Sequence, residues 1–480
     1  MIKPICLCLP LLLAVSAYAQ LGQMTPAQAQ EDFDVMRQAL EEAHSGLYRY
    51  STKPEIDGMF AAQRAKLDRP MNTAELWTIL SETLAQIRCG HTGMDPDQTT
   101  SAAAATAKKF PLRVRVQGPD RLVVLFNDTA DNQTIRPGAE ILKINGRSAG
   151  DVLKRIWRTM SADGDIESGK RERMGNFALY YWLAIEQAAE FSIEFRDGSS
   201  TASVKLAGVT DAERTSHQNA VNAGIHSGLD QLNWFHDNLS IRFLKDPEIA
   251  QIRIRGFSGK DFPQWMEDTF KSLREKGTKT LIVDLRQNGG GVDMYGAMLV
   301  SYLTDKPFRY FDHINVRTIA PRFKGESDWN RSRETELSER MIRNPKVGFL
   351  VPASIHPGVA EQMPGKYPFL GKVFVLTDGR TFSTSADFCA VVHHLKRAIF
   401  IGEETGGGYY GNNSGMSTRV TLPHLKSRVG IQMYEYWNAV DGTGQKRRGT
   451  LPDHRVETKV ADLLRGIDEP LNVALRLANQ

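Results

Sequence analysis

Along residues 374–410, the pattern of hydrophobic and polar positions changes from that of a strand to that of a helix and back to that of a strand. A short apolar run at 374–376 precedes a polar turn, and a second apolar run at 398–401 ends before a glycine triplet. Between the two runs, apolar residues recur at the i, i+3, i+4, i+7 spacing of a helix face; they are Phe388, Val391, Val392 and Leu395. The pattern predicts a βαβ unit with Ser383 at or near the start of its helix.

A serine at the start of a helix has two interpretations. Its hydroxyl can cap the helix by accepting a hydrogen bond from a backbone N–H group. Alternatively, the helix dipole and the free N–H groups stabilise developing negative charge, which suits a nucleophile. The local pattern leaves both open for Ser383, and Ser385 is a second hydroxyl close by.

Strands and helices alternate before this unit, which indicates an α/β core. The turn after the second of these strands contains Gly289, Gly290 and Gly291. Consecutive glycines let the backbone approach a ligand and direct N–H groups at it. The motifs of dinucleotide-binding and phosphate-binding loops are absent, so an oxyanion hole or a simple tight turn remains. The expected elements are strands at 249–254 and 280–285 and helices at 261–276 and 292–303.

The flanking segments are assigned more coarsely. We expect irregular structure at 305–369, strands near 418–422 and 429–436, and a terminal helix from Val460. Upstream, residues from Thr25 and from Thr73 have helical periodicity, and 101–109 is predicted to be an alanine-rich linker. A second linker is expected at 210–233. Alternating positions between them predict a β-rich module with a helical insertion at 151–187; its strands are 112–116, 122–126, 140–144, 191–195 and 204–206.

Two histidines lie in predicted loops of the N-terminal region. The helix that begins at Thr73 stops at Gly90, which we expect to be its C-terminal glycine, and His91 follows in the loop. His44 is a competing candidate in a similar loop. Each has a structural interpretation as well as a catalytic one.

Composition narrows the class of protein. The 480 residues are 41% hydrophobic and 24% charged, which indicates a globular chain of two or three domains. A net charge of +4 without a long basic run argues against a nucleic-acid partner. We expect no metal or cofactor site.

The first 19 residues have the features of a secretory signal, with cleavage expected after Ala19. No later stretch approaches the roughly 20 apolar residues of a membrane span, so we expect an exported protein without one. A lipid anchor is the alternative, although Cys6 and Cys8 lack an attachment context. Cys89 and Cys389 then remain, either paired or buried as free thiols.

The order of these motifs resembles the family of tail-specific, or C-terminal processing, serine peptidases, which includes the tricorn core and the modules of interphotoreceptor retinoid-binding protein. The resemblance implies an α/β fold whose crotonase-like (ClpP/crotonase) core of ββα units spans 234–480. It also implies an N-terminal helical region at 20–100 and a PDZ-like β-rich module at 108–208, which captures peptides in other proteins. The segments that carry the resemblance are 90–92, 138–146, 284–291, 381–387, 402–408 and 449–453.

The resemblance also implies the catalytic residues. It assigns the nucleophile to Ser383 and the oxyanion hole to the backbone N–H groups of Gly290 and Thr384. Serine–lysine members carry a lysine at the position of Gly408. The tricorn-like branch uses a histidine instead, which corresponds to His91.

The partner that orients this histidine is not identified. The tricorn-like branch has a serine at the position of Gly90 and a late glutamate at that of Lys446. The expected function is that of an exported serine-type peptidase acting on peptides or proteins. The alternatives are a non-catalytic protein that binds a peptide or hydrophobic ligand, and an esterase or amidase. The sequence does not specify the oligomeric state.

Overall fold

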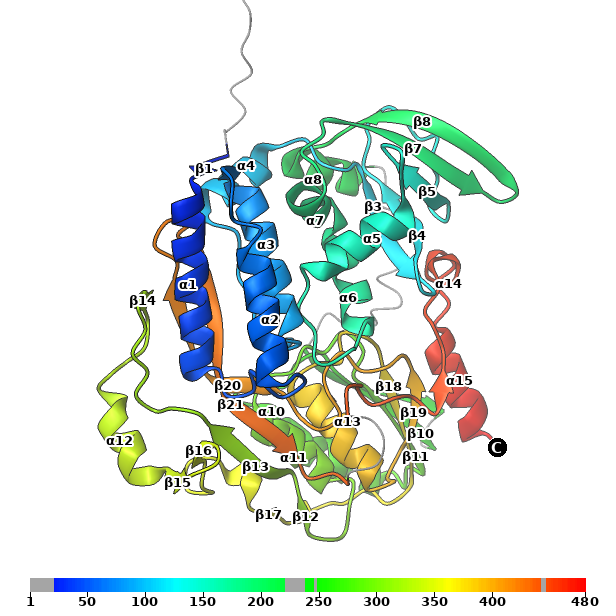
Figure 1. Cartoon of the computed structure of the whole chain (residues 1–480). Coiled ribbons are helices and arrows are strands. Elements are labelled where there is room, and N and C mark those ends of the chain that lie inside the picture. The colour runs from blue at the N-terminus through cyan, green and yellow to red at the C-terminus, as the bar shows by residue number, and fades with distance from the viewer. Residues whose placement is uncertain (1–20, 221–237, 246–247, 442–445) are drawn as a thin grey trace, which may run out of the picture.

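The computed structural model describes residues 21–220, 238–245, 248–441 and 446–480, without the side chains of 217–220. The predicted signal segment at 1–19 lies outside these residues, as does 221–233 of the second predicted linker. The described chain has a mixed α/β fold with three six-stranded sheets. In Figure 1, helices α1 to α3 and a β-rich module stand side by side on the core.

The first sheet contains the predicted βαβ unit. Its order is β22-β19-β18-β11-β10-β9, and every neighbouring pair is parallel except β10 with β9. The central strands are apolar because helices cover the sheet. The strands are β9 (Leu239–Lys245), β10 (Ile249–Ile254), β11 (Thr280–Asp284), β18 (Lys372–Thr377), β19 (Ile399–Gly402) and β22 (His454–Arg455). The helices are α10 (Phe262–Glu275), α11 (Asp293–Ser301) and α13 (Thr384–His394).

The second sheet is antiparallel, with the order β14-β20-β21-β13-β16-β15. Its β13 comes from residues 305–369, where irregular structure was expected, so that expectation was wrong. The pairing of β13 with β21 joins residues more than a hundred positions apart, which local periodicity does not reveal. The elements are β13 (Phe311–Val316), β14 (Glu326–Ser327), α12 (Arg333–Arg340), β15 (Ile342–Asn344), β16 (Gly348–Leu350), β20 (Asn413–Thr421) and β21 (Arg428–Asn438), with a small pair β12 (Phe308–Arg309) and β17 (Glu361–Gln362).

The N-terminal helices pack on this core through one continuous hydrophobic cluster that includes both sheets. The predicted linker at 101–109 is mostly helix, so that prediction was wrong. Alanine has the highest helix propensity, and Asp97 caps the helix by accepting the N–H groups of Thr99 and Thr100. The helices are α1 (Pro26–Ala43), α2 (Lys53–Arg64), α3 (Thr73–Gln86) and α4 (Gln98–Thr106), and β1 (Gln23–Met24) pairs with β2 (Met71–Asn72).

The β-rich module has a hydrophobic cluster of its own. Its five predicted strands and helical insertion are confirmed. The second predicted linker was wrong in part, because α8 (Asp211–Ala220) occupies its beginning. The module contains β3 (Leu112–Gln117), β4 (Arg121–Asn127), β5 (Glu140–Ile144), β6 (Arg147–Ser148), α5 (Ala149–Arg158), α6 (Ser168–Glu172), η1 (Arg173–Asn176), α7 (Phe177–Ala184), β7 (Glu190–Asp197) and β8 (Ser200–Ala207).

The predicted terminal helix is divided in two, α14 (Val460–Leu464) and α15 (Glu469–Ala478), and α15 packs against β18 and β19. Cys89 and Cys389 are both buried and free, so the unpaired alternative is confirmed. Among the described residues, no helix combines the length and the apolar character needed to cross a membrane.

Carboxylates gather where the β-rich module meets the core. Glu172 accepts a hydrogen bond from Arg115 at 2.5 Å and one from Gln287 at 3.0 Å, and Gln287 also donates to Asp378 at 2.6 Å. Burial, reinforced by the charge of Glu172, raises the pKa of Glu403 to about 7. The same two causes raise the pKa of Asp378 to about 6.

These shifts predict that stability falls as pH rises. The unfolded chain loses the Glu403 proton near its usual pKa of 4.5, whereas the folded protein keeps it until about pH 7. Replacing Glu403 with glutamine should therefore increase the free energy of unfolding at pH 8 by roughly 1–3 kcal/mol. The gain should vanish near pH 4.5, and urea unfolding at both pH values measures it. Exposed Glu339 is the control for the same substitution, and an equal gain at both pH values contradicts the prediction.

Candidate active site

The glycine turn and the Ser383 turn meet at the carboxyl edge of the first sheet. They follow β11 and β18, which are parallel neighbours. The Thr381 hydroxyl donates to the carbonyl of Leu285 at 3.0 Å, and the Phe382 N–H donates to that of Asn288 at 3.0 Å. These bonds fix the two turns against each other.

Ser383 has a strained backbone. Its φ of 56° and ψ of −130° lie outside the regions that non-glycine residues favour, at a cost of roughly 1–3 kcal/mol. Its side chain makes no capping hydrogen bond, so the capping interpretation was wrong. The residue is half-buried at the start of α13, while Ser385 is completely buried within the helix. Ser383 is therefore the serine that a substrate can reach.

Gly290 lies directly against Ser383. Its φ is 103°, and a Cβ atom at this position would come within 2.6 Å of the Ser383 Cβ and 3.0 Å of the Thr384 nitrogen. Only glycine fits this contact. Within the described chain, the Thr384 N–H has no acceptor, whereas the Gly290 N–H donates to the Asn288 side-chain oxygen at 2.9 Å. Of the two predicted oxyanion donors, the one from Thr384 is open.

Asp293, at the start of α11, fixes the first residue of α13. Its carboxylate accepts the Thr384 hydroxyl at 3.1 Å and the Tyr436 hydroxyl at 2.9 Å, and it lies 3.1 Å from the ring nitrogen Nε2 of His356. Asp293 and its partners were not identified from the sequence. Their contacts join segments that are far apart along the chain.

His91 lies beside the residue that precedes Ser383. Its ring stacks on Phe382 with 4.4 Å between centroids. Nδ1 is buried without a hydrogen-bond partner among the described residues. Burial lowers the pKa of His91, and the carboxylates of Asp163 and Asp293 raise it in part. His91 is therefore neutral at neutral pH.

The loop that carries His91 differs in detail from the expectation. Arg88, with a φ of 62°, is the left-handed residue after α3, so the prediction that Gly90 has this role was wrong. Position 90 instead favours glycine for a steric reason, because a Cβ atom there would lie 2.8 Å from the Phe382 ring.

The competing histidine has a structural role. His44 is completely buried, and its Nε2 lies 2.8 Å from the hydroxyl of Thr92. Burial and the charge of Arg317 lower its pKa to about 3. His44 supports the loop of His91 and faces no solvent.

Neither the position implied for an alternative lysine base, Gly408, nor the one implied for a late glutamate, Lys446, supplies a catalytic group. Lys446 is exposed. A Cβ atom on Gly408 would lie 2.8 Å from the carbonyl oxygen of Gly411, so no lysine fits there. The buried group at this place is Asp163, whose carboxylate accepts the N–H of Gly90 at 2.7 Å and that of Gly408 at 3.3 Å. No sequence signal marked Asp163, which lies in the helical insertion.

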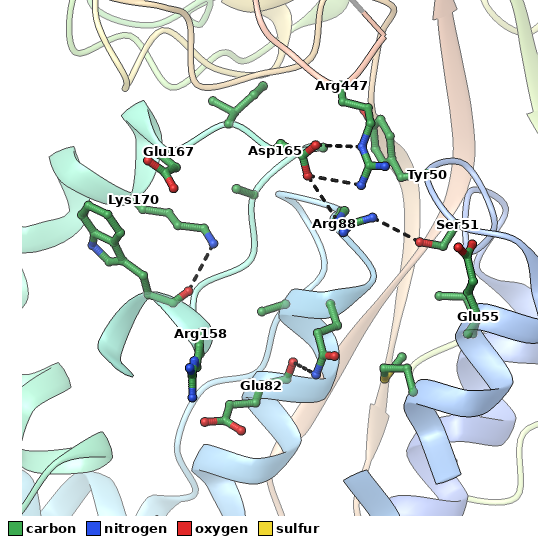
Figure 2. A pocket seen from close by; sticks show the side chains of 18 of the residues that line it. Tyr50, Ser51, Glu55, Glu82, Arg88, Arg158, Asp165, Glu167, Lys170 and Arg447 are labelled. Atoms are coloured by element: carbon green, nitrogen blue, oxygen red, sulfur yellow. Dashed lines mark hydrogen bonds and ion pairs between the residues drawn. The ribbon is translucent and has the colours of Figure 1, made fainter. Parts of the chain in front are cut away.

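Two cavities adjoin the His91 loop. A cavity of about 210 Å³ is lined by His91 together with Ser81, Arg173 and Tyr180. A cavity of about 750 Å³ opens between α2, α3 and the helical insertion. Figure 2 shows Asp165 in the larger cavity, between Arg88 and Arg447. Within the described parts of the chain, no group of three or more His, Cys, Asp or Glu side chains is placed to hold a metal ion.

Residues 248–456 match the model of peptidase family S41. This segment is an S41 peptidase domain. It contains Ser383, Gly290 and Thr384, whereas His91 and Asp163 precede it.

Solved structures share the mixed α/β fold of this chain. Mature CPAF has a TM-score of 0.65 and 15% identity, over 95% of this chain and 98% of that one. CPAF complexed with lactacystin has a TM-score of 0.64 and 15% identity, over 95% and 99%. No curated protein matches the sequence significantly. The family and the fold support a peptidase.

Proposed function

We propose that the protein is an exported serine-type endopeptidase in which Ser383 is the nucleophile and His91 is the general base. The observation that carries the proposal is the strained conformation of Ser383 at the start of α13, in direct contact with Gly290. The His91 ring stacks on Phe382, the residue before Ser383. Backbone strain of this kind is concentrated at functional sites.

The proposed reaction begins when the neutral His91 removes the proton of the Ser383 hydroxyl, and the oxygen attacks a peptide carbonyl. The open Thr384 N–H and the dipole of α13 stabilise the oxyanion. The Gly290 N–H joins them by turning from the Asn288 oxygen toward the oxyanion. His91 then gives its proton to the leaving amine, and water hydrolyses the acyl-enzyme.

The proposal includes the organisation of the chain. Residues 1–19 form the signal peptide, 20–100 the N-terminal helical region, and 234–480 a crotonase-like catalytic core. Residues 108–208 form a PDZ-like module that presents the peptide or protein substrate. The six-stranded sheet of this module, with the order β3-β4-β5-β7-β8 and β6 beside β5, supports substrate capture by strand addition at a sheet edge.

A fluorophosphonate probe with mass mapping tests the nucleophile. Wild-type protein should gain one adduct on Ser383, and lactacystin, which is bound in a CPAF structure, should slow the labelling if the two sites are alike. A protein that binds peptides but remains unlabelled and uncleaving supports the non-catalytic alternative. A labelled protein that cleaves small esters but no peptide supports an esterase or amidase.

The pH dependence tests the base. Because burial lowers the pKa of His91 below its usual value of 6.5, the unprotonated base persists into mildly acidic solution. We expect kcat/KM for a peptide to be constant above about pH 6.5 and to fall with a single acidic limb below it. The pH profile of kcat/KM measures this limb. A limb centred above pH 7 contradicts the assignment of His91.

A further inference from the structure

Residues 163–165, between α5 and α6 of the helical insertion, connect the His91 loop to the peptidase core. The Gly164 N–H donates to the carbonyl of Arg88 at 3.1 Å, and the Asp165 N–H donates to that of Arg447 at 2.8 Å. The Asp165 carboxylate lies 2.8 Å from Arg447 and 3.5 Å from Arg88 (Figure 2). The segment is therefore held on both sides.

Gly164 makes this connection possible. Its φ is +57°, and a Cβ atom would lie 2.4 Å from the carbonyl oxygen of Arg447. The backbone therefore passes in direct contact with the core. This close passage brings the preceding residue, Asp163, between the His91 loop and the glycine turn at Gly408.

Asp163 is completely buried, and its two carboxylate oxygens accept different backbone groups. One accepts the N–H of Gly90, next to His91, at 2.7 Å, and the other accepts the N–H of Gly408 at 3.3 Å. Its carboxylate thus lies beside the histidine loop and away from the protein surface.

We propose that Asp163 is the positioning residue of the active site: it fixes the His91 loop against the Ser383 turn and supplies negative charge that stabilises the protonated imidazole during the reaction. Asp163 acts through the backbone of Gly90 and through space, because the Nδ1 atom of His91 has no bonded partner among the described residues. The inference rests on the proposed Ser383–His91 reaction.

The other charges around His91 do not replace this function. Asp293 also raises the pKa of His91, but its carboxylate is bonded to Thr384, Tyr436 and His356. Arg173 lines the small cavity beside His91 and is cationic, so it cannot supply negative charge to the ring. Asp163 is the larger of the two negative influences on His91.

The test replaces Asp163 with asparagine and measures peptide cleavage between pH 5 and 9. We expect kcat to fall about 10- to 100-fold with KM changed less than about threefold, a smaller loss than for a carboxylate bonded directly to a catalytic histidine, because Asp163 acts through the backbone of Gly90. The acidic limb of kcat/KM should move to lower pH, because the lost negative charge favoured the protonated ring. A purely structural brace would lower thermal stability and the active fraction but leave the limb in place.

Glu167→Gln is the matched control, since it removes an exposed carboxylate of the same insertion that bonds neither Gly90 nor Gly408. In this variant the acidic limb of the kcat/KM profile should stay where it is in the wild type, and the rate of peptide cleavage should stay within about threefold of the wild-type rate. If Asp163→Asn does not fold, Asp163→Glu keeps the charge but displaces it, and we expect a lower kcat with an unmoved limb.

The proposal is overturned if Asp163→Asn cleaves peptides at the wild-type rate and the acidic limb of its kcat/KM profile does not move. If Asp163→Asn does not fold, a wild-type rate in Asp163→Glu overturns it. Failure of the wild-type protein to label at Ser383 instead overturns the proposed function. The two failures are therefore distinguishable.

Discussion

Replacement of Ser383 by alanine is expected to abolish peptide cleavage, lowering kcat by roughly 10⁴-fold or more. The variant lacks the oxygen that forms the acyl-enzyme. The fold should persist, because the hydroxyl makes no capping bond and alanine presents the same Cβ atom to Gly290. Mass-spectrometric detection of peptide products, with thermal unfolding measured in parallel, tests both parts.

Ser385→Ala provides the matched control two residues further along the chain. The Ser385 hydroxyl is completely buried and has no hydrogen-bond partner among the described residues, so its loss should leave cleavage within about threefold of wild type. Cleavage that survives in Ser383→Ala and disappears in Ser385→Ala transfers the nucleophile to Ser385. Cleavage that survives in both variants overturns a serine mechanism.

Local patterns predicted the elements whose periodicity is set by burial. The strands β11, β18 and β19 are buried on both faces, so their apolar runs are visible in the sequence. The parallel pairing of β11 with β18 also explains how two separated turns meet at one edge. Ser383 and Gly290 could be placed together on this basis.

Patterns failed where the determining contact was distant or was made by side chains. The helix α4 depends on its Asp97 cap, although its alanines resemble a linker. The strand β13 depends on pairing with β21. The left-handed residue near His91 is Arg88, whose backbone carbonyl is bonded by the Gly164 N–H. The last two depend on a partner that a short window of sequence does not contain, whereas Asp97 stands directly before α4.

Sequence patterns also failed to reveal which residues surround His91. Ser383 and Gly290 belong to the segment matched by family S41, while His91 and Asp163 come from the N-terminal region and the helical insertion. The proposed site is thus assembled from three parts of the chain. Its activity should depend on how these parts dock, since the bonds of Asp163 to Gly90 and Gly408 join all three.

Replacement of Gly290 by alanine is expected to remove most activity, with a fall in kcat of about 100-fold or more. The added methyl group would lie 2.6 Å from the Ser383 Cβ, at a φ of 103° that alanine rarely adopts. Relief of this overlap must move the Ser383 turn, the Thr384 N–H or the glycine turn, and each movement separates the nucleophile from the oxyanion donors. Steady-state peptide cleavage and the rate of fluorophosphonate labelling measure the loss.

The control for this change is Gly289→Ala, one residue earlier in the same turn. A Cβ atom at Gly289 meets no atom within 4 Å, and its backbone has no positive φ. It should therefore preserve labelling and cleavage within about threefold. Equal losses in both variants would show that activity responds to stiffening of the whole turn and would contradict a specific contact between Gly290 and Ser383. A selective loss in Gly290→Ala, with the folded fraction unchanged, supports the contact as the feature that aligns Ser383 with the open N–H of Thr384.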